Sequence, residues 1–279
     1  AETFGDLEDG APMLYDKEAL KAAYESISSA DQALLARCVE RVERFAQAQR
    51  ESIKSMEVSI PGGVAGHDVA AVERAGCYAP GGRFPLPSSV IMTAVTARVA
   101  GVQEIWVASP KPTTITLAAA SISGADALLA VGGAQAIGAL AYGAGPIPPC
   151  DAIVGPGNRW VTAAKQLVSG HVAIDMLAGP SELVILADQS ASAEVIAADL
   201  LAQAEHDTDA LPILVSLSQE QIDAVQGELQ TQLETLPTAD TASKALENGY
   251  AVLAKDVQEG IDLCNRLAPE HLEVLMEDA

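Results

Sequence analysis

Short apolar runs alternate with segments of helical length over most of the chain after residue 75. Runs of strand length lie at residues 104–109, 127–131, 152–154, 183–187, 213–217 and 250–254. Between most of them, apolar residues recur every three or four positions, as in 88–100, 134–142, 159–168 and 193–204. Apolar strands that alternate with helices are typical of a parallel sheet covered on both faces. The pattern therefore predicts an α/β fold, preceded by a helical section whose apolar spacing is clearest at 34–46 and which ends at the break Pro61-Gly62-Gly63.

Three glycine-rich turns lie where an expected strand leads into an expected helix. They are Gly81-Gly82, the segment 132–135 and the segment 155–158; a fourth turn, 178–181, comes just before a strand. Glycine lets the backbone approach a ligand, and the N-terminus of the following helix attracts phosphate. These segments are therefore candidate nucleotide sites. Ordinary tight turns remain the alternative, and no GxGxxG fingerprint follows any strand.

Four histidines are present, and two of them follow a glutamate directly. On a helix, Gln203 and His206 leave the same face and could converge on one ion, although a polar helix end remains the alternative. Glu270 and His271 follow a proline, so we expect the pair to open a turn or a helix. Neighbouring Glu and His side chains can act as general base and acid near neutral pH, although two exposed polar residues remain the alternative.

The charge balance is strongly acidic, with 16 basic and 38 acidic residues and a net charge of −22. Such a surface repels phosphate backbones and anionic lipids, so we expect neither a nucleic-acid nor a membrane partner. The four cysteines lie far apart without a CxxC pair, and the first residues carry no secretory signal pattern, which together favour a reducing, cytoplasmic location. The most membrane-like stretch, 117–145, is broken by glycines, and we interpret it as helix, buried strand and helix.

Seven motifs, in this order, resemble the histidinol dehydrogenase family. They are GCYAPGG (76–82), PSSVIMTAVTARVAGV (87–102), VGGAQAIGALAYG (131–143), IVGPGNRWVTAAK (153–165), IDMLAGPSELVILAD (174–188), DLLAQAEHD (199–207) and LAPEHLEV (267–274). The resemblance implies two Rossmann-like α/β/α domains with mainly parallel sheets, one inserted in the other. We expect residues 1–75 and 183–279 to form the first, zinc-binding and catalytic domain, and 76–182 to form the second, NAD-facing domain.

The resemblance also implies residue roles. Tyr78, Gln135 and Asn158 match positions that contact NAD; Gln203 and His206 match two zinc ligands that also touch substrate. Ser181 matches a further substrate contact, and Glu270 and His271 match the catalytic pair, with His271 also touching substrate. The implied reaction is a four-electron, NAD-dependent oxidation of L-histidinol to L-histidine through L-histidinaldehyde, the last steps of histidine biosynthesis, by a homodimeric zinc enzyme.

Two expectations qualify this resemblance. Family members are longer, and their remaining zinc ligands, an Asp and a His, follow the PEHL motif; we therefore expect the 279-residue sequence to be a fragment with weak zinc binding and little turnover. Relatives of the family oxidise sulfonated propanediols, and the segment 81–89 with Arg83 is similar to that branch. A sulfonated-diol dehydrogenase and a non-catalytic nucleotide-binding fragment are thus the alternative functions.

Overall fold

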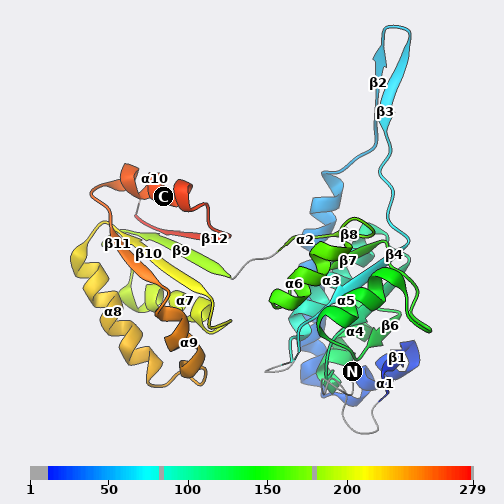
Figure 1. Cartoon of the computed structure of the whole chain (residues 1–279), viewed down its shortest axis with the longest axis horizontal. Coiled ribbons are helices and arrows are strands. Elements are labelled where there is room, and N and C mark those ends of the chain that lie inside the picture. Colours follow the sequence, from blue (N-terminus) through cyan, green and yellow to red (C-terminus); the bar gives the residue numbers. More distant parts are fainter. Residues whose placement is uncertain (1–11, 82–84, 178–180, 278–279) are drawn as a thin grey trace. The chain divides into compact units, whose positions relative to one another are not determined.

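The structure is a computed structural model that describes residues 12–81, 85–177 and 181–277. It divides into two compact units, Ala1–Ala178 and Gly179–Ala279, and each has its own sheet and core (Figure 1). Residues 82–84 and 178–180 lie outside the described residues, so parts of the expected turns at Gly81-Gly82 and at 178–181, and Arg83, are not described.

The N-terminal unit is built on a six-stranded sheet with the order β1-β6-β5-β4-β7-β8. These strands are β1 (Leu14–Asp16), β4 (Arg74–Tyr78), β5 (Glu104–Ala108), β6 (Ala127–Leu129), β7 (Ala152–Val154) and β8 (Ala173–Ile174). All neighbouring pairs are parallel except β1 and β6. An edge strand that runs antiparallel on an otherwise parallel sheet is common in doubly wound folds.

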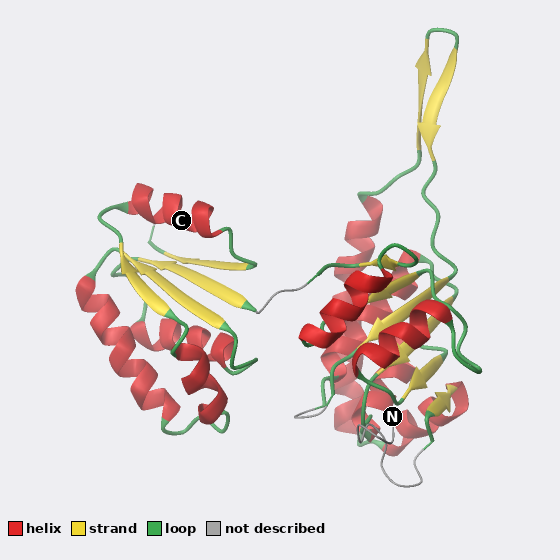
Figure 2. Ribbon diagram, in the orientation of Figure 1, coloured by secondary structure: helices red, strands yellow, loops and turns green. Residues whose placement is uncertain are grey.

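Helices cover both faces of this sheet (Figure 2). One face packs against α1 (Lys17–Ser26), α2 (Ser29–Glu51), α3 (Pro87–Ala100) and α4 (Thr114–Ser123), and the other against α5 (Gly133–Tyr142) and α6 (Arg159–Val168). Successive strand residues alternate between the two cores: Cys77 belongs to the first and Tyr78 to the second. Many buried helix positions are alanine, such as 118–120 in α4, and small side chains of this kind allow close packing of helices on the strands.

A two-stranded hairpin, β2 (Met56–Ile60) and β3 (Gly63–His67), extends from the N-terminal unit between α2 and β4 (Figure 1). The strands pair antiparallel from Met56 opposite His67 to Ile60 opposite Gly63, and every residue of both strands is exposed. From the sequence, Pro61-Gly62-Gly63 predicts only the end of a helical section. Pro61 and Gly62 instead form the turn of this hairpin, because Gly62 adopts a φ of +88°, which glycine tolerates without strain.

The C-terminal unit has an all-parallel sheet with the order β11-β10-β9-β12. Its strands are β9 (Glu182–Ala187), β10 (Leu211–Ser216), β11 (Tyr250–Leu253) and β12 (His271–Leu275). One face of the sheet packs against α7 (Ala193–Ala204) and α8 (Gln219–Leu233), and α9 (Ala239–Leu246) packs beside α7. The other face packs against α10 (Val257–Leu267).

The expected α/β class with mainly parallel sheets is confirmed, as are all six expected strands to within a few residues. The grouping of the N-terminal residues differs from the expectation that 1–75 joins 183–279. Here α1 packs on α4 and α2 packs on α3. The buried face of α2, which includes Leu35 and Val39, contributes to the core of the N-terminal unit, so these helices belong to that unit. The division between the units falls at 178/179.

Candidate functional site

A cavity of about 450 Å³ lies in the C-terminal unit between α7 and the start of β12. It is lined by Leu183, Asp199, Ala202, Gln203, His206, Glu270, His271, Leu272 and Glu273. Two motifs that lie far apart in the sequence, QAEH and PEHL, therefore meet at one cavity. The cavity lies at the amino-terminal ends of β9 and β12, since Leu183 and His271 are at or next to the first residues of these strands.

Helix α7 contributes the face that carries Asp199, Gln203 and His206. These positions are separated by four and three residues, the spacing that places side chains on one face of a helix. The helix itself ends at Ala204, and the N–H of His206 donates to the carbonyl of Gln203 at 3.3 Å, which continues the turn far enough to keep His206 on that face.

Gln203 is 7% exposed, and its Nε2 atom has no hydrogen-bond partner among the described residues. A buried amide without a partner costs free energy, on the order of 1–3 kcal/mol, so such a group calls for a ligand. A 180° rotation of the terminal amide swaps its oxygen and nitrogen. The side chain can therefore present either an acceptor or a donor to a ligand in the cavity. Gln203 is consequently the residue of this site that most clearly points to a ligand.

Glu270 and His271 lie at the other side of the cavity. The Nε2 atom of His271 is 4.0 Å from Oε1 of Glu270, and the backbone N–H of Glu270 donates to Oε1 of Glu182 at 3.3 Å. The expectation that this pair opens a helix or turn is wrong, because His271 begins strand β12 and pairs in parallel with Leu183 of β9. Strand pairing fixes the direction in which the His271 side chain leaves the backbone.

Sequence reasoning missed Asp199 and Glu273, which complete the acidic lining of the cavity. Glu273 lies two residues after His271 and therefore on the same face of β12. Partial burial raises the pKa of the Glu273 carboxyl, and the nearby Asp199 raises it further by charge repulsion and a shared hydrogen bond, against an opposing effect of His271. The helical spacing from Gln203 and the strand spacing from His271 were the sequence signals that could have identified both residues.

The glycine turns of the N-terminal unit follow the carboxyl ends of β4, β6 and β7. Tyr78 ends β4, Gln135 lies in the first turn of α5, and Asn158 precedes α6. Among the parallel strands of this sheet, the chain order reverses between β4 and β7, which is the position where open α/β sheets bind ligands. The structure thus brings Tyr78 and the turn that contains Asn158 to the two strands that flank this switch point.

Local contacts hold these three residues. The Tyr78 hydroxyl accepts a hydrogen bond from the N–H of Gly133 at 3.0 Å, and Tyr78 is 4% exposed. The Asn158 side-chain oxygen accepts from the N–H groups of Trp160 and Val161 at 3.1 and 3.2 Å, and so caps α6. Gln135 is exposed, and its side chain lies over Gly133.

A sequence model of the family described as histidinol dehydrogenase matches residues 1–279. The chain belongs to the histidinol dehydrogenase family. It is 49% identical to the histidinol dehydrogenase of Thermus thermophilus over 97% of this chain and 66% of that protein, and 44% identical to that of Methanocaldococcus jannaschii over 94% of this chain and 62% of that protein. The chain thus spans just under two thirds of the length of these curated relatives.

The fold of the histidinol dehydrogenase family is also found by structure comparison. The crystal structure of histidinol dehydrogenase from Elizabethkingia anophelis matches with a TM-score of 0.89 and 32% identity, over 96% of this chain and 63% of that one. This match covers both units and agrees with the α/β architecture described above.

Ser181, which the sequence resemblance predicts as a substrate contact, directly precedes β9. It is half-buried, and its carbonyl accepts a hydrogen bond from the N–H of Leu211 at 3.0 Å. Ser181 is not among the described residues that line the cavity, whereas Leu183, two residues later, is.

A metal ion would find only part of a coordination sphere here. Within the described ranges, no group of three or more His, Cys, Asp and Glu side chains is arranged to hold one. Gln203 and His206 nevertheless converge on the same cavity, and the amide of Gln203 carries an unpartnered polar atom. A tetrahedral zinc site takes four ligands, so these two residues fit as a portion of such a site.

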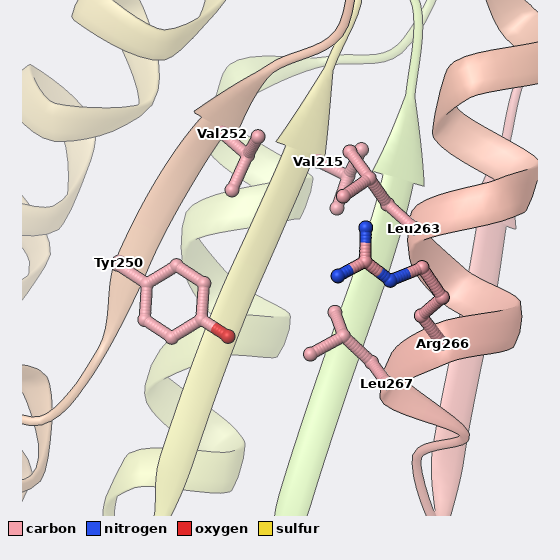
Figure 3. Close-up of a pocket in the computed structure, with 6 residues that line it drawn as sticks. All are labelled: Val215, Tyr250, Val252, Leu263, Arg266 and Leu267. Carbon is pink, nitrogen blue, oxygen red and sulfur yellow. The ribbon is translucent and has the colours of Figure 1, made fainter.

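A second, smaller cavity of about 190 Å³ lies on the opposite side of the C-terminal sheet. Figure 3 shows its lining, which comes from β10, β11 and α10: Val215, Tyr250, Val252, Leu263, Arg266 and Leu267. It brings together no acid–base pair and no metal-ligand type of side chain.

Among the described helices, none is long and apolar enough to cross a bilayer.

Proposed function

We propose that the protein oxidises L-histidinol to L-histidine with NAD, through L-histidinaldehyde, at the last steps of histidine biosynthesis. One observation carries the proposal: Gln203, His206, Glu270 and His271, from two motifs far apart in the sequence, line one cavity. Membership of the histidinol dehydrogenase family and the unpartnered amide of Gln203 support it.

In this proposal His271 accepts the hydroxyl proton of the alcohol while a hydride leaves the carbon that bears this hydroxyl. The product is the aldehyde. Glu270 then removes a proton from the water that attacks the aldehyde carbon, and the resulting hydrate loses a second hydride to become the carboxylate. NAD supplies the hydride acceptor for each oxidation, and Tyr78, Gln135 and Asn158 are the proposed contacts for it. Local contacts support the roles of Glu270 and His271 at the same cavity: strand pairing holds His271, and the hydrogen bond from the N–H of Glu270 to Glu182 holds Glu270.

Gln203 and His206 are the proposed ligands for zinc. A bound zinc ion would hold nitrogen atoms of the substrate and fix the reacting carbon in place. Ser181, Gln203, His206 and His271 would contact the substrate itself. The Gln203 amide suits this role because its position is fixed by burial on α7.

The charge of the cavity favours histidinol over a sulfonated diol. Three carboxylates, those of Asp199, Glu270 and Glu273, line it, and no Lys or Arg is found among its described lining residues. These negative charges attract a protonated amine and repel a sulfonate. We therefore expect kcat/KM to be higher for histidinol than for 2,3-dihydroxypropane-1-sulfonate; the reverse preference would replace histidinol with the sulfonated diol.

The Glu270→Gln variant tests the mechanism. With wild-type protein, even at the low turnover expected of this chain, two NADH should form for each histidinol consumed, with histidine as the product. The variant should still oxidise the alcohol but slow the second oxidation about a hundredfold, because general-base catalysis contributes on this order. Glu247→Gln, at an exposed position after α9, is the matched control. Unchanged second oxidation in Glu270→Gln would refute the role of Glu270, and no NADH from wild-type protein with zinc would refute the proposed function.

The proposal extends to a cytoplasmic homodimer, as the resemblance to the family implies. Light scattering of the protein tests the assembly: a mass of twice the chain supports the homodimer, and a single-chain mass contradicts it.

A further inference from the structure

Lys165 of α6 is 3% exposed, although a buried ammonium group is costly unless it is paired. Its Nζ atom donates to the carbonyl oxygen of Gly155 at 3.1 Å and forms an ion pair with the carboxylate of Asp175. Gly155 lies in the turn that follows β7, and Asp175 lies directly after β8. None of the roles described above uses this charge pair.

Asp175 holds the opposite side of the same glycine. Its Oδ2 atom accepts a hydrogen bond from the N–H of Gly155 at 2.7 Å, and its Oδ1 atom also accepts from the N–H of Met176 at 2.7 Å. The N–H and the C=O of Gly155 are therefore bound to the two ends of a single ion pair. Charge-assisted hydrogen bonds of this kind are stronger than neutral ones.

Gly155 also has little freedom to move. Its φ is +122°, and a Cβ atom at this position would lie 2.0 Å from the carbonyl oxygen of Tyr78. The glycine begins the turn that ends at Asn158, the cap of α6. The ion pair thus fixes the first residue of this turn against the end of β4, at the switch point of the sheet.

We infer that Lys165 and Asp175 are positioning residues for nucleotide binding, which hold the turn 155–158 in the conformation that a dinucleotide contacts. This inference rests on the proposed use of NAD. A turn that is already ordered saves the cost of ordering on binding. The pairing also neutralises Asp175, whose unpaired charge would repel an anionic pyrophosphate.

The test compares Lys165→Met and Asp175→Asn with wild-type protein. Calorimetry at a temperature where all variants are folded should show NAD binding at least tenfold weaker in both variants. Hydrogen exchange of the amides in 153–161 should be at least fivefold faster, with or without NAD.

Glu104→Gln is the control, since it removes the ion pair of Glu104 with Arg74, in which Oε2 and Nε are 2.6 Å apart. These two residues begin β5 and β4, at the ends of the strands opposite to the turn 155–158. It should lower thermal stability without changing NAD affinity. A merely structural role predicts that Lys165→Met behaves like this control, and that result, or unchanged exchange in 153–161, would overturn the inference. Wild-type protein that binds no NAD would instead refute the cofactor assignment, and the inference would fall with it.

Discussion

The hydroxyl of Tyr78 accepts a hydrogen bond from the backbone N–H of Gly133, 3.0 Å away, so that the end of β4 is joined to the first residue of α5. We expect Tyr78→Phe to lower the free energy of unfolding by about 1 kcal/mol, the usual value of one hydrogen bond. NAD affinity should fall severalfold, because Gly133 begins the helical turn that carries Gln135. Urea denaturation and calorimetry measure the two effects; Tyr142→Phe, at a side chain that is 60% exposed, should change neither. Equal values in both variants would contradict this prediction.

Two glycines of the N-terminal unit should respond to alanine in opposite directions. Gly155→Ala meets the Tyr78 carbonyl at 2.0 Å with a φ of +122°, so we expect a loss of roughly 3 kcal/mol or more in the free energy of unfolding. Gly138 lies within α5, and a Cβ atom added there would have nothing within 4 Å, so Gly138→Ala should gain about 0.5–1 kcal/mol. Denaturant titration checks both. A tolerated alanine at Gly155 would show that the turn can move away from Tyr78.

The raised pKa of Glu273 predicts a pH-dependent stability difference. A carboxyl whose pKa is higher in the folded state destabilises the protein as pH rises from the unfolded value, about 4.3, through the folded value. Glu273→Gln removes the repulsion from Asp199, so its Tm should exceed that of wild-type protein at pH 8, and the two should converge near pH 4. Glu234→Gln, at an exposed position after α8, is the control. A Tm difference that grows toward low pH would have the wrong sign.

The cysteines should differ sharply in reactivity. Burial raises the pKa of the Cys77 and Cys150 thiols to about 12, and burial also raises the pKa of Cys264. Only Cys38, half-buried on α2, is left to react quickly with a disulfide reagent in the folded protein. We expect one fast-reacting thiol, which Cys38→Ser removes and Cys150→Ser leaves in place. Fast reaction of two or more thiols would mean that the cores open readily.

Most strands of the parallel sheets could be predicted because their burial on both faces produces continuous apolar runs, as in 183–187. The central strand β4 and the short strand β8 were not among the six expected strands, since β4 reads Arg-Ala-Gly-Cys-Tyr and β8 has only two residues. Strand β12 was missed because it is an edge strand that carries polar His271 and Glu273 on one face, so its sequence lacks that run. The hairpin β2–β3 was missed for a related reason: fully exposed strands have no burial pattern to reveal them.

Individual residues of the candidate site could be predicted from the sequence, but their assembly around one cavity could not. Helical spacing placed Gln203 and His206 on one face, but the position of His271 opposite Leu183 depends on a long-range strand pairing that no local pattern encodes. Asp199 and Glu273 lie outside the Glu-His and Gln-x-x-His pairs and became visible only when α7 and β12 were brought together. The ion pair of Lys165 with Asp175 depends likewise on two segments that meet at one glycine.

The parallel pairing of β12 with β9 also has a consequence for biosynthesis. Glu270 and Glu182, which are linked by a hydrogen bond, are 88 residues apart in the chain. Pairings of such long range close late and slowly, and a ribosome delivers the N-terminal partner first. The Glu270-His271 pair can therefore reach Gln203 only after nearly the whole C-terminal unit has been translated, and until then the edge of β9 is available to other strands and to chaperones.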